Sequence, residues 1–142
     1  MRKSWIRYIL SVLLIAVTAV SLSCSTGSET RTATPTGLES RSLEKALASG
    51  KPTLVDFGST TCIPCKNMKT TLEELDPLYR DRVNLVIVIV DDEANQEIVA
   101  HYQIMTIPTQ IFFNSTGEVV AGHVGEMVRD DIVAQFKKMG IE

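Results

Sequence analysis

Two cysteines spaced three positions apart, Cys62 and Cys65, form the motif of this chain with the most readily predicted chemistry. They follow a short β-rich run and begin a stretch with helical periodicity, which predicts a position in the first turn of a helix. Free backbone N–H groups and the positive end of the helix dipole stabilise a thiolate at such a position. In Cys-x-x-Cys motifs the thiol pKa can fall from about 8.5 to roughly 3.5–7.5. The spacing therefore predicts a redox-active disulfide between Cys62 and Cys65.

The order of the two cysteines suggests their roles in thiol–disulfide exchange. Cys62 comes first and is expected to face solvent, so we predict that it attacks the substrate disulfide. Cys65 lies one turn further into the helix, where it can resolve the mixed disulfide and release the product. Pro64 suits the first turn because its missing N–H needs no partner there. Ile63 and Pro64, which separate the cysteines, are predicted to contact the substrate.

Two other uses of the cysteine pair remain open at this point. A purely structural disulfide is disfavoured, because a ring of about four residues stabilises a fold by only about 2 kcal/mol, against about 3 kcal/mol for a 15-residue loop. A zinc or copper site would need further ligands, and His101 and His123 lie on separate predicted elements. A metal-binding chaperone module is thus the alternative function. The favoured redox reaction needs no metal, and no cofactor other than the disulfide itself.

Helical and β-type hydrophobic patterns alternate on both sides of the pair. Pro77 disfavours helical geometry at Asp76, so the helix that follows the cysteines is expected to kink or end there. The segment 83–90 is almost wholly apolar, which is typical of a strand buried on both faces. The order of elements predicts a mixed sheet with helices packed on it. The predicted strands cover residues 53–57, 83–90, 109–113 and 118–124, and the predicted helices cover residues 43–47, 63–79, 94–102 and 128–139.

Four short segments resemble, in their order and spacing, the thioredoxin family. They are Leu-Val-Asp-Phe at 54–57, Cys-Ile-Pro-Cys-Lys at 62–66, Ile-Pro-Thr at 107–109, and Gly-Glu at 117–118 with a glycine at 125. The resemblance implies the thioredoxin-like α/β fold, with a mixed four- to five-stranded sheet and helices on both faces. It also implies thiol–disulfide oxidoreductase activity.

The resemblance implies roles for residues outside the cysteine motif. Asp56 is similar to the family's buried carboxylate, which helps to move a proton on and off the resolving Cys65. Burial in an apolar strand is expected to raise the pKa of this carboxyl, so that it can act as a general base near neutrality. Pro108 is similar to the cis-proline that faces the cysteine pair. Backbone groups of Ile107 would pair with an extended substrate segment.

The sequence also departs from the family pattern. Cytosolic thioredoxins have Trp before the first cysteine and Gly after it, where this chain has Thr61 and Ile63. Residues 86–90 contain no lysine, although the family usually has one there. These changes affect the expected reduction potential and substrate surface rather than the exchange mechanism. Pro64, in place of the histidine usual in oxidants, favours a reductant, and an envelope disulfide oxidase or isomerase is the alternative.

The first 23 residues have the pattern of an export signal. Arg2, Lys3 and Arg7 form a positively charged segment without acids, and the apolar stretch from Ile9 to Val20 follows. This stretch is short enough for a signal peptide, whereas a membrane-spanning helix needs about 20 residues. We therefore predict a signal peptide at residues 1–23 and an exported protein, with an uncleaved anchor helix as the alternative.

Cys24, directly after this segment, resembles the lipid-attachment cysteine of bacterial lipoproteins. Residues 24–37 are rich in Ser, Thr and Gly, which predicts a flexible tether. Residues 38–142 are predicted to form one thioredoxin-like domain. The predicted location is therefore the cell envelope or periplasm, at a membrane, as a lipoprotein. An incidental cysteine beside an ordinary cleavage site is the alternative.

The composition fits such a protein and excludes other classes. The 142 residues include 14 Lys+Arg and 17 Asp+Glu, for a net charge of −3, so a basic nucleic-acid-binding surface is excluded. Residues 1–23 hold three of the basic residues and none of the acidic ones, so cleavage would leave a net charge of −6. The predicted partners are exported proteins with oxidised cysteine pairs and an integral membrane thiol carrier of the cytochrome c biogenesis type. The domain is predicted to be a monomer.

Overall fold

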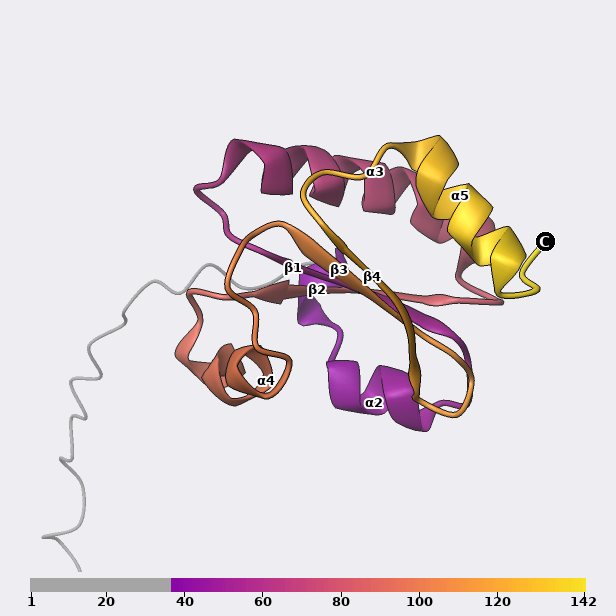
Figure 1. The fold of residues 1–142 in the computed structure, drawn as a ribbon, viewed down its shortest axis with the longest axis horizontal. Helices are drawn as coiled ribbons and strands as arrows, with labels where there is room; N and C mark the ends of the chain where they lie inside the picture. The colour runs from indigo at the N-terminus through magenta and orange to yellow at the C-terminus, as the bar shows by residue number, and fades with distance from the viewer. Residues whose placement is uncertain (1–36) are drawn as a thin grey trace, which may run out of the picture. The chain divides into compact units, whose positions relative to one another are not determined.

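Apolar strands at the centre of the chain build a single sheet. The computed structural model describes residues 37–142. Strands β1 (Thr53–Gly58) and β2 (Asn84–Ile89) pair in parallel, β3 (Thr109–Phe113) pairs antiparallel with the other side of β1, and β4 (Val119–Val124) pairs antiparallel with β3. The strand order is β2-β1-β3-β4. Every residue of β1 is buried, because this strand has a neighbour on each side and helices on both faces (Figure 1).

Helices cover both faces of this sheet (Figure 1). Helices α3 (Ile63–Tyr79) and α5 (Arg129–Lys138) lie on one face, called here the α3/α5 face. Helices α2 (Leu43–Ala48) and α4 (Gln96–His101) lie on the opposite one, the α2/α4 face. The short 3₁₀ helices η1 (Gly37–Ser40) and η2 (Glu93–Asn95) precede α2 and α4.

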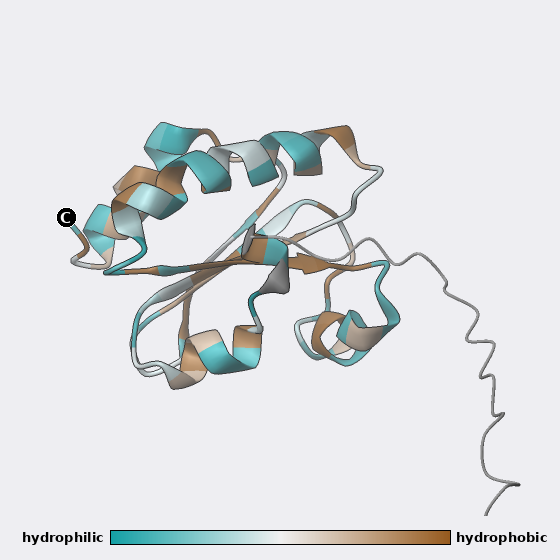
Figure 2. Cartoon of the chain, turned by 180° about the vertical axis from the view of Figure 1, so that it is seen from behind, coloured by the Kyte–Doolittle hydropathy of each residue, from teal (hydrophilic) through white to brown (hydrophobic). Residues whose placement is uncertain are grey.

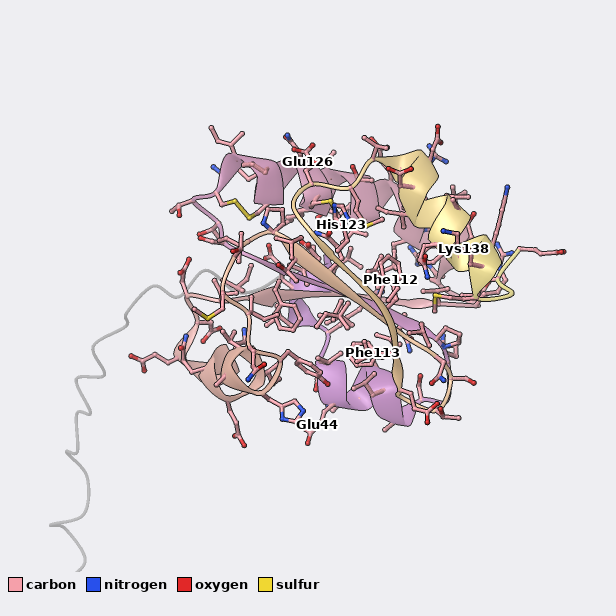
Figure 3. The ribbon with its side chains drawn as sticks, viewed as in Figure 1. Glu44, Phe112, Phe113, His123, Glu126 and Lys138 are labelled. Atoms are coloured by element: carbon pink, nitrogen blue, oxygen red, sulfur yellow. A yellow bond between two sulfur atoms is a disulfide. The ribbon has the colours of Figure 1, made fainter. Side chains whose placement is uncertain are left out.

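Alternation along the strands divides the core into two apolar clusters. Successive strand residues point to opposite faces of a sheet. Leu54 and Phe112 therefore belong to the cluster on the α3/α5 face, and Val55 and Phe113 belong to the cluster on the α2/α4 face. Phe112 and Phe113 accordingly lie on opposite sides of the ribbon in Figure 3. The strands are largely hydrophobic, whereas the helices carry hydrophilic residues interleaved with hydrophobic ones (Figure 2).

The predicted fold class is confirmed: the sheet is mixed, has four strands and carries helices on both faces. The predicted strands and helices occur in the predicted order, with ends that differ by a residue or so. The segment 94–102 was expected as one helix, but η2 occupies its first residues and α4 begins at Gln96.

The proline was expected to kink helix α3 at Asp76 or to end it there; the helix does not end at Asp76 but continues through Pro77 to Tyr79. The Asp76 carboxylate accepts hydrogen bonds from the Arg41 guanidinium at 2.6 and 2.9 Å and forms an ion pair with Arg80 at 3.0 Å. These contacts hold the last turn in place despite the restriction that proline puts on the preceding residue.

The predicted signal peptide at residues 1–23, the lipidated Cys24 and the tether as far as residue 36 lie outside the described residues. These assignments, and the boundary of the domain at residue 38, stay predictions. Within residues 37–142, no helix is both long enough and apolar enough to cross a membrane.

Candidate active site

The two cysteines lie at the start of α3, as the spacing predicts. Cys62 is the N-cap residue of the helix, and its Sγ accepts a hydrogen bond from the Cys65 backbone N–H at 3.3 Å. Pro64 occupies the first turn, where no carbonyl partner is needed. The two sulfurs form a disulfide, with the Cα atoms 5.3 Å apart (Figure 3).

The two cysteines differ in exposure. Cys65 is only 4% exposed, whereas Cys62 is half-buried. Ile63, between them, is 71% exposed and presents an apolar surface beside the disulfide. This arrangement fits the predicted roles, in which Cys62 meets the substrate and Cys65 reacts from within the protein.

Asp56 lies on β1 beneath the disulfide-bearing helix and is almost completely buried. Its Oδ1 accepts a hydrogen bond of 2.7 Å from the side-chain amide of Gln110, on the neighbouring strand β3. Burial raises the pKa of the Asp56 carboxyl to about 6, and the hydrogen bond from Gln110 partly opposes this rise. A carboxyl with such a pKa can exchange protons near neutrality.

A cavity of about 150 Å³ connects the carboxyl with the buried cysteine. Its wall includes Asp56, Gly58 and Cys65, and the ion pair between Lys69 and Glu39, at 2.6 Å, lies at the same cavity. A Cβ atom at position 58 would lie 3.1 Å from the Cβ of Cys65 and 3.6 Å from Oδ2 of Asp56. The missing side chain of Gly58 therefore leaves the carboxyl and the cysteine facing a common space.

The predicted substrate segment lies at the same end of the sheet. In the antiparallel pairing, Thr109 at the start of β3 lies opposite Phe57 near the end of β1, from which the chain runs to Cys62. The peptide bond between Ile107 and Pro108 is cis, as the resemblance implies. Pro108 itself is buried, and Ile107 is half-buried.

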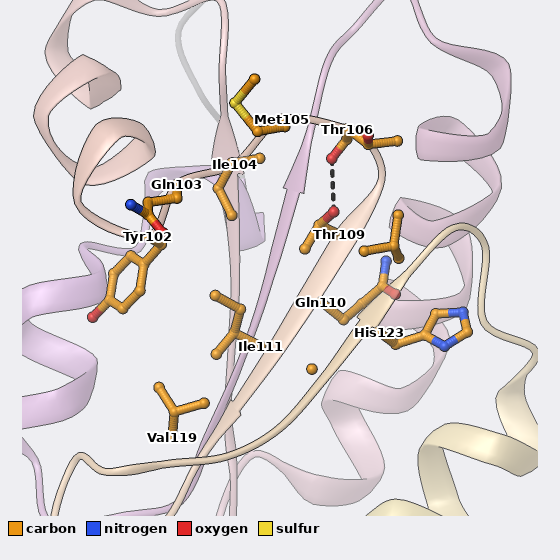
Figure 4. A pocket seen from close by; sticks show the side chains of 12 residues that line it. Tyr102, Gln103, Ile104, Met105, Thr106, Thr109, Gln110, Ile111, Val119 and His123 are labelled. Atoms are coloured by element: carbon orange, nitrogen blue, oxygen red, sulfur yellow. Dashed lines mark hydrogen bonds between the residues drawn. The ribbon is translucent and has the colours of Figure 1, made fainter.

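A groove of about 370 Å³ borders this segment (Figure 4). Residues 102–106 line one part, among them Met105, which is 91% exposed, and residues of β3 and β4 line the rest. The Thr109 hydroxyl donates a hydrogen bond of 2.6 Å to the carbonyl of Thr106 and closes the turn around the proline (Figure 4).

Comparison with known proteins identifies this arrangement. The family model for thioredoxin matches residues 35–138, a range that includes both cysteines of the pair, Asp56 and Pro108. The chain belongs to the thioredoxin family.

Individual members of this family are similar over most of the described residues. A thioredoxin of Alicyclobacillus acidocaldarius subsp. acidocaldarius is 34% identical over 99 residues, which are 70% of this chain and 91% of that protein. The thiol:disulfide interchange protein TxlA homolog of Synechocystis sp. is 33% identical over 120 residues, 80% of this chain and 66% of that protein. The structure of Deadhead, a germline-specific thioredoxin of Drosophila melanogaster, superposes with a TM-score of 0.59 at 23% identity, over 68% of this chain and 90% of that one, and shows the same fold.

Thioredoxin-family membership and the disulfide between Cys62 and Cys65 together make this protein a thiol–disulfide oxidoreductase. Among the residues that the structure describes, no group of three or more His, Cys, Asp or Glu side chains is placed to hold a metal ion. His101 packs against the ring of Tyr102, and His123 lies exposed on β4 (Figure 3).

Three features of this thioredoxin-like site were not predicted from the sequence. Gln110 is the hydrogen-bond partner of Asp56, and Gly58 opens the cavity beside Cys65. Ser59 donates a hydrogen bond to the Asp91 carboxylate and contacts the Thr61 hydroxyl at 3.1 Å, which braces the loop before Cys62. A signal for Gln110 does exist, because it is a polar residue that directly precedes the apolar residues 111–113 of the same strand.

Proposed function

We propose that this protein is an exported reductant that reduces disulfides of cell-envelope proteins and is held at the membrane by a lipid on Cys24. The observation that carries the proposal is the combination of an export-type N-terminus with a Cys62-Ile63-Pro64-Cys65 pair at the start of a helix. Pro64 stands where oxidants of the superfamily usually have histidine, and its presence favours the reducing direction.

In the proposed reaction, the reduced protein uses a Cys62 thiolate and a Cys65 thiol. Cys62 Sγ attacks one sulfur of the substrate disulfide, so that the substrate S–S bond breaks, one substrate thiolate leaves and a mixed disulfide forms. Cys65 then transfers its proton to the Asp56 carboxylate and attacks Cys62 Sγ. The mixed disulfide breaks, the second substrate thiolate leaves, and the Cys62–Cys65 disulfide forms. The substrate has gained two electrons, and the protein has lost two.

The segment that holds the cis-proline is the proposed place where the substrate backbone binds. An extended segment would pair with backbone groups of Ile107, as in other β-augmentation contacts. Ile63 and Met105, which are 71% and 91% exposed, would offer apolar contacts to the substrate. Pro64 and Pro108 would shape the surface between them.

The oxidised protein needs a source of electrons outside the cytoplasm. An integral membrane thiol carrier of the cytochrome c biogenesis type would supply them by the reverse exchange at Cys62. The proposed substrates are exported proteins with oxidised cysteine pairs, of which apocytochrome haem-binding motifs are one class. A lipid on Cys24 and the tether that follows would keep the domain within reach of such a carrier.

A redox titration of the Cys62–Cys65 pair tests the direction of electron flow. We expect a reduction potential close to that of thioredoxin, about −270 mV, and catalysis of insulin disulfide reduction. A potential near that of the strong oxidants, about −120 mV, would contradict the reductant proposal and favour the oxidase.

Trapping in the native host tests the partners. The Cys65→Ala variant should accumulate mixed disulfides through Cys62, and the double variant Cys62→Ser/Cys65→Ala is the matched control that should capture nothing. Recovery of exported proteins and a membrane thiol carrier supports the proposal. Capture of neither contradicts the proposed substrates and carrier.

A Cys24→Ser variant tests the lipid anchor. It should leave the membrane fraction, and its retention there would contradict lipid anchoring.

A further inference from the structure

Gln110 has an unusual environment for an amide side chain. It is completely buried, and its Nε2 donates the hydrogen bond of 2.7 Å to Oδ1 of Asp56. Its Oε1 is also buried and has no hydrogen-bond partner among residues 37–142. A buried carbonyl oxygen without a partner is unfavourable, and an apolar side chain at this position would avoid it. Packing alone therefore does not explain the amide.

The register of the sheet sets the contact between Gln110 and Asp56. β3 and β1 are antiparallel, and Gln110 and Asp56 are directly opposite each other. Directly opposite residues share a face of the sheet, with their side chains within contact distance. The amide therefore reaches the carboxyl from a largely buried strand that contributes no residue to the disulfide.

The two oxygens of the Asp56 carboxyl have different surroundings. Oδ1 is held by Gln110, whereas Oδ2 lies beside the space that Gly58 leaves open. A Cβ atom placed in that space would be 3.6 Å from Oδ2 and 3.5 Å from Cys65 Sγ. The free oxygen and the resolving sulfur thus border the same space. The cavity of about 150 Å³ at this position is large enough for water.

We propose that Gln110 is a positioning residue for proton transfer between Asp56 and Cys65, because its hold on Oδ1 keeps Oδ2 directed at the space beside Cys65 Sγ. In the resolving step the Cys65 S–H bond breaks and its proton passes to Oδ2, directly or through water in the cavity. The Cys65 sulfur then bonds to Cys62 Sγ, the bond from Cys62 to the substrate breaks, and the substrate sulfur leaves as a thiolate. The inference rests on thiol–disulfide exchange through the pair, and not on the proposed direction, location or partners.

Other polar groups also line the cavity beside the Asp56 carboxyl, among them Ser59 and Thr60 of the loop before Cys62. From α3, the titratable groups at its cavity are Cys65, Lys66 and Lys69, and from η1 there is Glu39, which pairs with Lys69. The residues that β2 contributes to the cavity are the apolar Ile87 and Ile89. On β4, His123 lies opposite Gln110 in the register and is exposed. The amide of Gln110 also favours the ionised carboxyl, which supports a role as proton acceptor.

The two chemical steps can be observed separately with Ellman's reagent, an aromatic disulfide. Attack by Cys62 on this reagent releases one thionitrobenzoate, and resolution by Cys65 releases the second, so stopped-flow absorbance reports both steps. The experiment uses reduced full-length protein between pH 5 and 8. The variants are Gln110→Met, which keeps the length but loses the amide, and Gln110→Asn, which keeps the amide but is too short for the same contact. Phe112→Leu is the control, because Phe112 is a buried residue of the same strand and face that does not contact Asp56 in this way.

We expect both Gln110 variants to slow the second release roughly tenfold on its high-pH plateau, a part of the 10²–10⁴-fold that a general base contributes. The midpoint of the pH profile should also move upward, because a carboxylate that loses a hydrogen bond is a stronger base. The first release should change less than about twofold, and Phe112→Leu should leave the profile in place. In an Asp56→Asn background, Gln110→Met should have no further effect on the second release.

Three results would overturn the proposal in distinguishable ways. A shifted midpoint with an unchanged plateau means that Gln110 tunes the pKa of Asp56 without positioning it. Equal slowing of both releases, or the same slowing in the Asp56→Asn background, means that Gln110 acts through general structure. Absence of a second release in the wild-type protein removes the resolving role of Cys65, on which the exchange mechanism itself depends.

Discussion

The two faces of the sheet are both covered by helices, yet they differ in what they bury. The α2/α4 face is filled with hydrocarbon and aromatic groups, among them Val55, Phe57 and Phe113. The α3/α5 face has a similar apolar cluster around Phe112, but at its cysteine-bearing end it also buries Asp56 and Gln110. Strands β1 and β3 supply residues to both faces, and the alternation of side chains along each strand places Asp56 and Gln110 on the α3/α5 face.

This difference separates stability from chemistry. A carboxylate that is buried against one neutral amide opposes folding at neutral pH, since burial disfavours its charged form. The α2/α4 face has no such group in its cluster, so it can stabilise the sheet without affecting the reactive end. Changes at the cysteine-bearing end of the α3/α5 face should therefore alter reactivity and its pH dependence, and changes on the α2/α4 face should alter stability.

The largest effect is expected for Cys62→Ser on the α3/α5 face, as a loss of disulfide reduction activity. Without the attacking sulfur, disulfide reduction should fall to the uncatalysed background in an insulin turbidity assay. The stability of the reduced protein should change little, because Cys62 is only half-buried. Thr60→Ser, at an exposed position of the same loop, should keep full activity. Residual catalysis by Cys62→Ser would mean that another group starts the exchange.

The next largest effect is expected for Phe113→Ala on the α2/α4 face. Phe113 is 1% exposed, and its ring packs edge-on against Tyr102 with centroids 5.6 Å apart. Truncation of a buried Phe to Ala destabilises proteins by about 3–5 kcal/mol, which urea unfolding would measure. The folded fraction should release both thionitrobenzoates from Ellman's reagent at wild-type rates. Altered rates would show that the two faces are coupled.

Asp56→Asn should raise the stability of the fold, whereas Phe113→Ala lowers it, and should also lower reactivity. In the unfolded chain the Asp56 pKa is near 3.8, and in the fold burial raises it to about 6. Well below the unfolded pKa of 3.8 both states are protonated and the substitution should be neutral. As the pH rises from the unfolded pKa to the folded pKa, the unfolded state loses its proton first. The wild type therefore loses stability, on the order of 3 kcal/mol by pH 7. Unfolding of both proteins at several pH values measures the difference.

Asp76→Asn is the matched control for this prediction. Asp76 is also buried, but its carboxylate is paired with Arg41 and Arg80. Loss of its charge should therefore destabilise the fold near neutrality, because the two guanidinium groups lose their partner. A stabilising effect at both positions would indicate that burial alone, rather than the partner, decides the sign.

The positions of the candidate site residues on their elements were predictable from the sequence, because residue type and local spacing carry that information. Cys62, Cys65 and Pro64 lie within one turn of a helix whose first residue was also predicted. The resemblance to the family implied the burial of Asp56, a charged residue in an apolar strand. Each of these signals is contained in a few consecutive residues.

The supporting residues depend on contacts that local spacing does not contain. Gln110 faces Asp56 only because β3 pairs with β1 in one particular register. Gly58 opens a cavity only because α3 brings Cys65 over the end of β1. Helix α3 continues through Pro77 because Arg41, distant in the sequence, holds Asp76. Tertiary packing decides all three features.

The smallest effect is expected for Gly58→Ala, which tests whether the open space on the α3/α5 face matters. The added Cβ would lie 3.1 Å from the Cβ of Cys65, so one of them must shift by a few tenths of an ångström. We expect the second thionitrobenzoate release to slow by no more than roughly fivefold, which is about 1 kcal/mol in activation free energy. Gly122→Ala on β4 is the control, because its Cβ would meet only the backbone carbonyl oxygen of Gln110 at 3.7 Å, an ordinary contact. Equal rates for both variants would show that proton transfer does not use this space, which would also contradict the proposed route from Cys65 to Oδ2 of Asp56.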